Sequence, residues 1–393
     1  MTTSTPKNIL VIGGAGYIGC GLVRDLLARG FRVRALDSLL FGDEPLRPLI
    51  DDPHFELVRG DFRQVEAVVR AVRDMDAVIH LGGIVGDPAC AVNEDETLEI
   101  NLSATRLLAG VSRAMGVSRF LFASSCSVYG ATEETVDETS SLNPVSLYAA
   151  TKADSEKVLL AARDETFHPV ILRLGTAFGW SCRPRFDLVV NLLVAKALAE
   201  RKIVIYNGEQ WRPFVHVRDI ARAFRLALEA PPEQVSGEIF NVGDDGMNFT
   251  LRQVAERMAA LEPGLVVEHL DNADRRNYRV SFAKIRERLG FERQVSLEQG
   301  IEGLERALRS RLVIDYRAPR FSNLAHRLAE QTAGHKPGDG SVALSALHFA
   351  RNSLWWRATG GNGKSHLLLS NGLISMALAP KAIDSQDSIR EVP

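Results

Sequence analysis

The chain has 393 residues, and its 47 basic and 49 acidic side chains leave a formal net charge of −2 at pH 7. This length exceeds what one small hydrophobic core supports, so we expect two packed units with room for an appendage. The balanced charge excludes a strongly basic nucleic-acid-binding protein, and no apolar stretch is long and continuous enough to span a membrane. We therefore expect no nucleic-acid or membrane partner and a soluble protein of the cytoplasm.

Residues 8 to about 175 alternate short β-branched runs with longer segments of helical period, which is typical of βαβ units on a parallel sheet. The predicted strands are residues 9–12, 31–36, 55–58, 77–80, 120–123 and 169–172. This pattern predicts an α/β fold with a doubly wound parallel sheet of the Rossmann type, formed by a dinucleotide-binding domain over residues 1–175.

Beyond this domain the alternation loosens. We expect residues 176–315 to form a smaller α/β substrate lobe that returns some elements to the first domain, including a strand at 238–242. From about residue 316 glycine, serine, histidine and asparagine become frequent and periodicity fades. Residues 316–393 are therefore predicted to be an irregular tail.

The first predicted strand is followed directly by Gly-Gly-Ala-Gly-Tyr-Ile-Gly, residues 13–19, which opens a helix. In such a turn Gly13 permits a tight bend, Gly16 lets backbone approach a pyrophosphate, and Gly19 permits close packing, while the helix N-terminus offers unpaired N–H groups. The spacing predicts a dinucleotide site, with Tyr17 and Ile18 inside the binding turn.

Asp37 ends the second predicted strand, 18 residues after Gly19, where a carboxylate can bind both ribose hydroxyls and repel a 2′-phosphate. We therefore expect NAD rather than NADP. Arg32 and Arg34 flank that strand and either accept a phosphate or face solvent. Asp61, which ends the third strand, either reaches the adenine amino group or caps the following helix.

Tyr148 and Lys152 lie four residues apart at the start of a helical pattern, so both side chains share one face. A nearby cation favours the phenolate, so this pair predicts a tyrosine whose pKa falls from about 10 toward working pH and which serves as a general base. Four dispersed cysteines without a C-x-x-C pair predict no metal site and a reducing compartment.

In combination these motifs resemble the extended short-chain dehydrogenase/reductase family, particularly its NAD-dependent nucleotide-sugar epimerases and dehydratases, over about residues 7–312. Further motifs carry the resemblance: Asp61 after a strand, His80-Leu81-Gly82-Gly83, Asn101, Ser-Ser-Cys-Ser-Val-Tyr-Gly at 124–130, Arg173, and Arg-Pro-Phe-Val-His-Val-Arg-Asp at 212–219.

The resemblance implies a site with assigned roles and a homodimer. Ser125 would hydrogen-bond the substrate oxygen beside the catalytic Tyr148, while Lys152 would also hold the cofactor ribose. The cofactor-binding residues would then be Gly13, Gly16, Tyr17, Ile18, Gly19, Asp37, Asp61, Phe62, Leu81, Gly82, Asn101, Tyr148 and Lys152. The substrate-binding residues would be Ser125, Ser127, Thr176, Arg212 and Arg276, with Arg275 as the alternative to Arg276.

Departures from the family pattern guide the choice of reaction. The family's 4,6-dehydratases and decarboxylases usually carry an acid just before Val-Tyr-Gly, where this chain has Ser127, and Thr176 replaces the usual asparagine. Without that acid, water elimination is disfavoured. We therefore expect an NAD-dependent epimerase acting on a nucleotide-diphosphate sugar, at C4 through a 4-keto intermediate. The alternatives are an NAD(P)H-dependent 4-ketosugar reductase and a non-catalytic dinucleotide-binding regulatory module.

Overall fold

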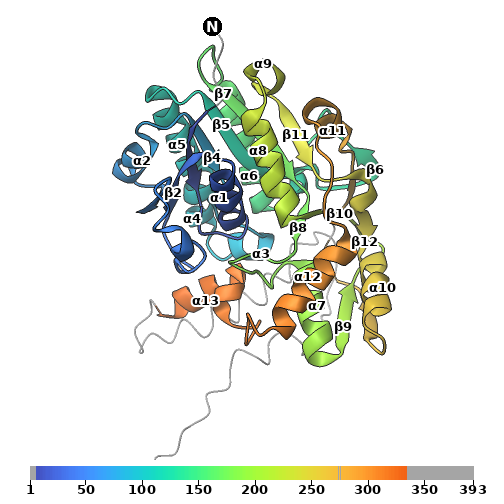
Figure 1. Ribbon diagram of the computed structural model, residues 1–393. Coiled ribbons are helices and arrows are strands. Elements are labelled where there is room, and N and C mark those ends of the chain that lie inside the picture. The colour runs from blue at the N-terminus through green and yellow to red at the C-terminus, as the bar shows by residue number, and fades with distance from the viewer. Residues whose placement is uncertain (1–5, 273, 275, 334–393) are drawn as a thin grey trace, which may run out of the picture. The chain divides into compact units, whose positions relative to one another are not determined.

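A computed structural model describes residues 6–272, 274 and 276–333 of the chain (Figure 1). Its central element is a parallel sheet with the strand order β11-β7-β5-β4-β1-β2-β3. The sheet strands are β1 (Asn8–Ile12), β2 (Arg32–Asp37), β3 (Phe55–Arg59), β4 (Ala77–His80), β5 (Arg119–Ser125), β7 (His168–Leu174) and β11 (Ile239–Val242). The predicted doubly wound fold is confirmed, because the strand order reverses beside β1.

Helices cover both faces of this sheet, and alternate residues of each strand enter different cores. In β1, Ile9 and Val11 join the core beneath α1 (Gly19–Ala28) and α8 (Val217–Glu229). Leu10 and Ile12 join the opposite core, beneath α2 (Val65–Val72), α5 (Ala104–Ala114) and α6 (Leu147–Ala161). Figure 1 shows α1 and α8 side by side on one face. Burial on both faces explains why the strands are continuously apolar in sequence.

The second lobe packs its own core from helices and short sheets. Its strands are β8 (Thr176–Phe178), β9 (Lys202–Tyr206), β10 (Trp211–His216), β12 (Asn248–Thr250) and β13 (Val266–Leu270), and its helices are α7 (Val189–Glu200), α10 (Leu251–Leu261) and α12 (Leu297–Arg309). The predicted strand at 238–242 is β11, which pairs in parallel with β7 as an edge of the main sheet. The helix α8 likewise returns to the first domain.

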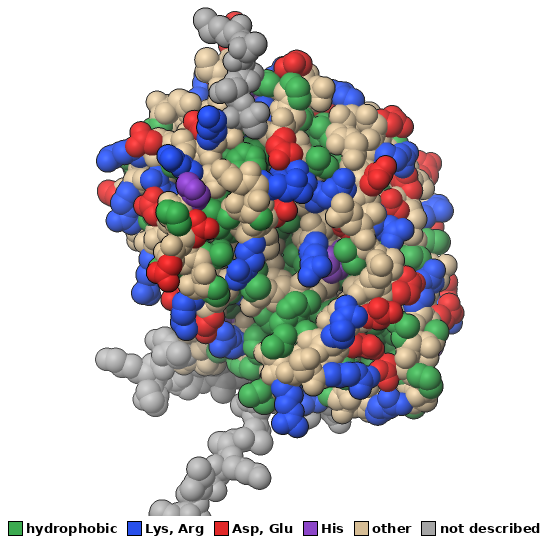
Figure 2. Space-filling view, viewed as in Figure 1, with side chains coloured by type: hydrophobic (Ala, Val, Ile, Leu, Met, Phe, Trp, Pro, Cys, Tyr) green, Lys and Arg blue, Asp and Glu red, His purple; other side chains and the backbone are tan. Residues whose placement is uncertain are grey.

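The remaining elements lie between those already described. They are β6 (Ala131–Val136), β14 (Asn277–Val280), α3 (Asp87–Cys90), α4 (Glu94–Leu98), α9 (Pro232–Val235) and α11 (Ala283–Leu289), and β14 pairs with β6. On the face seen in Figure 2, positive and negative side chains are interspersed rather than segregated. Among the described residues no helix has the length and hydropathy needed to cross a membrane.

The prediction of an irregular tail is wrong for its first part. Residues 323–333 form helix α13 (Asn323–Ala333), preceded by a short 3₁₀ turn at Pro319–Phe321. The Ser322 hydroxyl accepts the Ala325 backbone N–H and so caps the helix. Leu324 and Leu328, one turn apart, provide the apolar side. The rest of the predicted tail, 334–393, lies outside the described residues.

Candidate functional site

The glycine-rich turn lies at the carboxyl end of β1 and has the close contacts that its spacing predicts. Gly13 has a φ of +80°, and a Cβ there would lie 3.0 Å from the Gly82 backbone nitrogen. A Cβ on Gly19 would clash with the Gly13 carbonyl oxygen, so this glycine permits the turn to fold on itself. A Cβ on Gly16 would approach only the Gly13 oxygen, at 3.1 Å. The outer side of Gly16 is therefore open to a ligand.

The residues between these glycines provide backbone donors. Within the described part of the chain, the N–H groups of Tyr17 and Ile18 bind no acceptor, and they stand at the start of the ten-residue helix α1. The Tyr17 side chain points elsewhere, because its hydroxyl donates to the Gly179 carbonyl at 2.7 Å. Free N–H groups at a helix N-terminus suit a pyrophosphate. Tyr17 and Ile18 thus offer backbone rather than side-chain contacts.

Asp37 holds the turn from the end of β2. Its carboxylate accepts the backbone N–H groups of Ala15 at 2.9 Å and Leu39 at 2.8 Å. Burial raises its pKa, while these two donors oppose the rise. Each oxygen retains a lone pair for a further donor. Of the two arginines on the same strand, Arg34 pairs with Glu56 at 2.6 Å, and Arg32 is exposed.

The side chains predicted at the adenine end are only partly free. Asp61 forms an ion pair with Arg63 at 2.6 Å, and it does not cap α2, whose N-cap residue is Gln64. Phe62 packs against Gly82, because a Cβ on that glycine would lie 2.9 Å from the Phe62 ring. An adenine amino group would therefore share Asp61 with Arg63. Leu81 continues from β4 with its N–H donated to the Ile12 carbonyl at 3.0 Å.

The three residues predicted to be catalytic meet where β5 ends and α6 begins. Ser125 is the last residue of β5, and its hydroxyl is near enough to the Tyr148 phenol to lower the pKa of that phenol. Lys152 is one turn further along α6, with Nζ 5.9 Å from the centre of the Tyr148 ring. The Lys152 ammonium donates to the Ala123 carbonyl at 2.7 Å. The i, i+4 spacing thus places the phenol and the ammonium on one side of α6, and the end of β5 brings the Ser125 hydroxyl to them.

Burial dominates the proton equilibria of this group. It raises the pKa of the Tyr148 phenol well above its usual value, and the neighbouring Cys90 and Asp87 add to the rise, while Ser125 opposes it. Burial also lowers the pKa of Lys152, which is only 4% exposed, to about 8. The expected fall in the phenol pKa is therefore not seen in the protein alone, because desolvation dominates and the cation that opposes it is Arg185 rather than Lys152.

The polar atoms of the Asn101 side chain form hydrogen bonds within the protein. It is buried in a short π-helix, Glu99–Ser103, where its Oδ1 accepts the Ile84 N–H at 2.8 Å and its Nδ2 donates to the Ile84 carbonyl at 3.0 Å. A third contact joins Nδ2 to the Thr151 hydroxyl of α6 at 3.4 Å. Asn101 therefore fixes the loop after β4 against the helix that carries Tyr148. This arrangement does not support direct contact with a cofactor.

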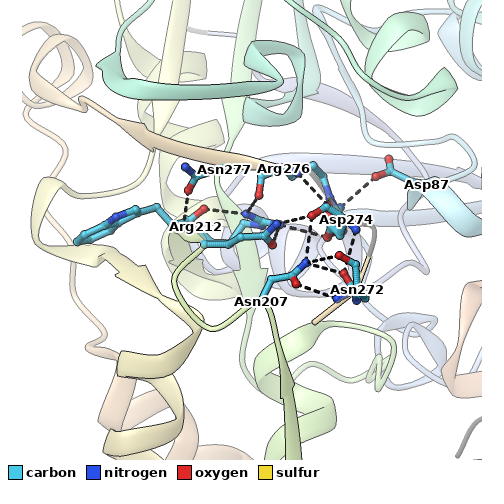
Figure 3. Close-up of polar contacts among 9 residues, drawn as sticks. Asp87, Asn207, Arg212, Asn272, Asp274, Arg276 and Asn277 are labelled. Atoms are coloured by element: carbon cyan, nitrogen blue, oxygen red, sulfur yellow. Dashed lines mark hydrogen bonds and ion pairs between the residues drawn. The ribbon is translucent and has the colours of Figure 1, made fainter. Parts of the chain in front are cut away.

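The two arginines predicted to hold a diphosphate lie together in the second lobe (Figure 3). Both bind Oδ2 of Asp274, at 3.2 Å from Arg212 and 2.7 Å from Arg276. Arg276 also forms an ion pair with Asp87 at 3.0 Å, which connects the lobe to the loop after β4. Arg275, the alternative to Arg276, lies outside the described residues. The guanidinium groups are thus already paired with carboxylates.

Two hollows adjoin this arginine cluster. A hollow of about 440 Å³ is lined by Asn207, Gly208, Glu209, Gln210, Arg252, His269, Leu270, Asp271 and Asn277. A smaller and more apolar one of about 110 Å³ is lined by Val189, Leu193, Val204, Ile205, Tyr206, Gln210, Leu251, Asn272 and Asp274. The second suits a flat, largely apolar group placed next to charged ones.

Thr176 and Ser127, the two small residues predicted to contact the sugar, are both at least partly buried. Thr176 is half-buried and begins β8, opposite Phe214 of β10. Ser127 is buried in the turn after β5, and its hydroxyl donates to the Ser125 hydroxyl at 2.9 Å. Ser127 therefore touches a member of the catalytic group directly.

Sequence reasoning did not predict that residues of the loop between β8 and α7 belong to the site. Arg185 is paired with both oxygens of Asp187, at 2.9 and 3.0 Å, and its charge acts on the Tyr148 phenol. Arg183 is buried, with its guanidinium 3.7 Å from the centre of the Phe41 ring. The signal was present as Arg-Pro-Arg just after a strand end, where ligands of doubly wound sheets bind.

Several proteins similar to this chain are nucleotide-sugar enzymes. The chain is 29% identical over 321 residues to UDP-glucuronic acid decarboxylase 1 of Arabidopsis thaliana, covering 78% of this chain and 70% of that protein. The solved dTDP-glucose 4,6-dehydratase DesIV of Streptomyces venezuelae, with NAD bound, is 28% identical with a TM-score of 0.70, covering 77% of this chain and 97% of that one.

A third relative is an epimerase. The solved UDP-glucose 4-epimerase of Thermotoga maritima, with UDP-glucose, is 26% identical with a TM-score of 0.69, and the match covers 78% of this chain and all of that one. The model of the NAD dependent epimerase/dehydratase family matches residues 9–243. The strand order, the glycine-rich turn and this match agree, so NAD is the cofactor and the chain belongs to the NAD-dependent epimerase/dehydratase family of enzymes.

Proposed function

We propose that the protein is an NAD-dependent epimerase that inverts C4 of a nucleotide-diphosphate sugar through a transient 4-keto intermediate. The observation that carries the choice is the turn after β5. This turn has Ser127, hydrogen-bonded to Ser125, at the position where the family's dehydratases and decarboxylases usually carry an acid. Without a carboxylate there, oxidation of the sugar is not followed by assisted elimination.

The residues present fit the cofactor. The open side of Gly16 and the unpaired N–H groups of Tyr17 and Ile18 suit the pyrophosphate, and Asp37 has lone pairs for ribose hydroxyls. Lys152 would hold the second ribose. When bound, NAD supplies a hydride acceptor and, in its oxidised form, a positive charge.

Tyr148 is proposed as the base that takes the proton of the C4 hydroxyl. Ser125 would donate to the sugar oxygen as it becomes a carbonyl, and the Lys152 ammonium would stabilise the phenolate. Burial disfavours the phenolate in the protein alone. The positive charge of oxidised NAD, bound near Tyr148, would therefore promote proton transfer to the phenolate oxygen. Inversion then requires the ketosugar to rotate in the site, so that its opposite face is the one that is reduced.

The substrate is proposed to lie across the two lobes. Arg212 and Arg276 suit a diphosphate because guanidinium groups bind phosphate oxygens in pairs, and the apolar hollow beside Asp274 suits a nucleoside base. The sugar would extend toward Ser125, Ser127 and Thr176. Since Asp274 and Asp87 now occupy the arginines, binding would exchange these carboxylates for phosphate oxygens.

Product mass separates the reactions of this family. We would incubate the purified protein with UDP-glucose, UDP-glucuronic acid or dTDP-glucose, without added dinucleotide, and analyse the products by mass spectrometry and chromatography. The proposal expects a product of unchanged mass and changed retention. Loss of water would identify a dehydratase and loss of carbon dioxide a decarboxylase, and either result would overturn the proposal.

A ketosugar reductase is the second candidate, since the same three residues could protonate a 4-keto sugar during its reduction. It would consume a reduced dinucleotide in every turnover, and no inversion would occur without one. Stoichiometric oxidation of added NADH or NADPH with a 4-keto substrate would favour this candidate. The homodimer implied by the family resemblance stays a prediction.

A further inference from the structure

Residues 316–333, which we name the strap, run from helix α7 of the second lobe to helix α3 of the first domain. At one end the Tyr316 hydroxyl and the Arg317 guanidinium both bind Glu200 of α7, at 2.6 and 2.7 Å. In the middle the Phe321 carbonyl accepts the Phe186 N–H at 2.8 Å. The strap ends in helix α13, which packs against α3 of the first domain.

One strap residue shares an apolar cluster with the catalytic tyrosine. Leu324, near the start of α13, packs against a small apolar cluster of the segment after β4 that includes Ile84 and Cys90, and Tyr148 packs against the same cluster. This cluster is separate from the main cores of the two lobes. Leu324 therefore connects the strap to the apolar cluster that supports the Tyr148 ring.

Its neighbour Asn323 connects the loops on either side of the site. The side-chain Nδ2 donates to the Val85 carbonyl after β4 at 3.2 Å, and Oδ1 accepts from Arg183 at 2.9 Å. The backbone N–H of Asn323 donates to Asp187 at 2.9 Å. One asparagine thus joins the loop after β4 to the loop after β8.

The strap also reaches the end of the site marked by Asp37. Arg183, which Asn323 holds, lies close enough to Asp37 for their charges to interact. Arg183 stacks on Phe41, and the other neighbour of that ring is His326 of α13, with ring centres 4.7 Å apart. The strap contacts therefore extend from the Asp37 end of the cofactor site to the apolar cluster beside the catalytic tyrosine.

Further along α13, Arg327 fastens the helix to the first domain. Its guanidinium donates to the Ala89 carbonyl at 3.1 Å and pairs with Glu96 at 2.6 Å. The solved relatives are covered almost completely by about three quarters of this chain. A substantial part of the chain therefore has no counterpart in them, and the strap lies beyond the matched family model, which ends at residue 243.

We propose that the strap closes over bound NAD and retains it between turnovers, with Asn323 and Leu324 as positioning residues for the loops and the phenol. The part concerning NAD rests on the family's cofactor alone. A second consequence, retention of the keto intermediate, rests on the proposed function. An enzyme that regenerates its cofactor in each cycle gains from such a cover, because release of either partner would leave a half-finished reaction.

The test measures how fast the dinucleotide dissociates from the full-length protein. Bound NADH is displaced by an excess of a competing ligand, and the change in NADH fluorescence is followed with time. We expect Asn323→Ala/Leu324→Ala to release NADH roughly tenfold faster, since lost contacts mainly raise dissociation rates. Leu324→Met should restore slow release when Asn323 is kept, because it conserves volume. Thr332→Ala is the matched control on the same helix, since within the described residues its hydroxyl donates to two carbonyls of α13 and to no other element.

A second variant guards against misfolding of the first. Arg327→Met removes two contacts from a partly exposed side chain and should also speed release. Release within about twofold of wild type in both folded variants would overturn the proposal, because dissociation would then not depend on the strap. If the strap variants release NADH quickly while wild type inverts no sugar, the strap proposal stands and the proposed function fails.

Discussion

The two halves of the site differ in how far they are prepared for a ligand. On the cofactor side, the glycine-rich turn offers N–H groups without acceptors within the described chain, and the open side of Gly16 leaves room. On the substrate side, Arg212 and Arg276 are already paired with Asp274. The difference indicates a cradle that is preformed for NAD, whereas a sugar nucleotide bound at the proposed position would have to displace the carboxylates that now neutralise the arginines.

The largest effect is expected for Tyr148→Phe, which removes the proton acceptor and keeps the ring. We predict that kcat falls by roughly a thousandfold or more, while NAD remains bound, because general-base catalysis by one group typically contributes two to four orders of magnitude. Turnover and bound dinucleotide are measured on the same preparation, with circular dichroism as the check on folding. Near wild-type turnover would remove Tyr148 from the chemistry.

The cofactor half of the site also contains the buried ammonium of Lys152. This charge makes the stability of the protein depend on pH. Burial lowers the pKa of Lys152 to about 8 from an ordinary 10.5. Between these values the unfolded chain binds more protons than the folded one, so the free energy of unfolding rises with pH. The ammonium costs on the order of 3 kcal/mol at lower pH.

Chemical denaturation of the cofactor-free protein at pH 8 and pH 10 measures this dependence. Lys152→Met cannot titrate there, so its stability relative to wild type should fall as the pH rises. A constant difference between the two proteins across this range would show that Lys152 keeps its ordinary pKa.

A methyl group tests whether the open side of Gly16 receives the cofactor. Gly16→Ala should weaken NAD binding by roughly tenfold, since the added Cβ meets only one protein atom but occupies the ligand's approach. Gly21→Ala, on the outer face of α1 where a Cβ meets nothing within 4 Å, is the matched control and should leave binding unchanged. Equal NAD affinity in the two variants would contradict a preformed cradle at Gly16.

The smallest predicted effect concerns the substrate half. Asp274→Asn removes the anion that competes for Arg212 and Arg276, and we expect KM for the sugar nucleotide to fall roughly threefold with kcat little changed. Steady-state kinetics at two ionic strengths measures it. A raised KM would instead show that Asp274 orients the arginines and that the substrate half is as preformed as the cofactor half.

The sequence predicts the cofactor half well because its signals are local. A strand, three glycines and an acid at fixed spacings determine the turn around Gly16 and Asp37, and the i, i+4 pair on α6 places Lys152 beside Tyr148. Local spacing cannot show what burial does to the phenol, because desolvation depends on every surrounding element. Local spacing also cannot show that the Asn101 side chain hydrogen-bonds the Ile84 backbone.

The strap was missed for a related reason. Its helix has an N-cap at Ser322 and apolar residues one turn apart, but this local signal is short and lies in a polar region. Its stability comes from partners distant in sequence, such as Glu200, Val85 and Glu96. Contacts across more than a hundred residues leave no periodicity that a sequence pattern could display.

The most direct test of the account is to denature the purified protein and identify the dinucleotide and any nucleotide sugar that it releases, by mass spectrometry. A self-contained epimerase with a preformed and covered cofactor site should release NAD in a near-stoichiometric amount, with no NADP. Release of NADPH, or of no dinucleotide, would contradict the account and favour a reductase that exchanges its cofactor in every turnover.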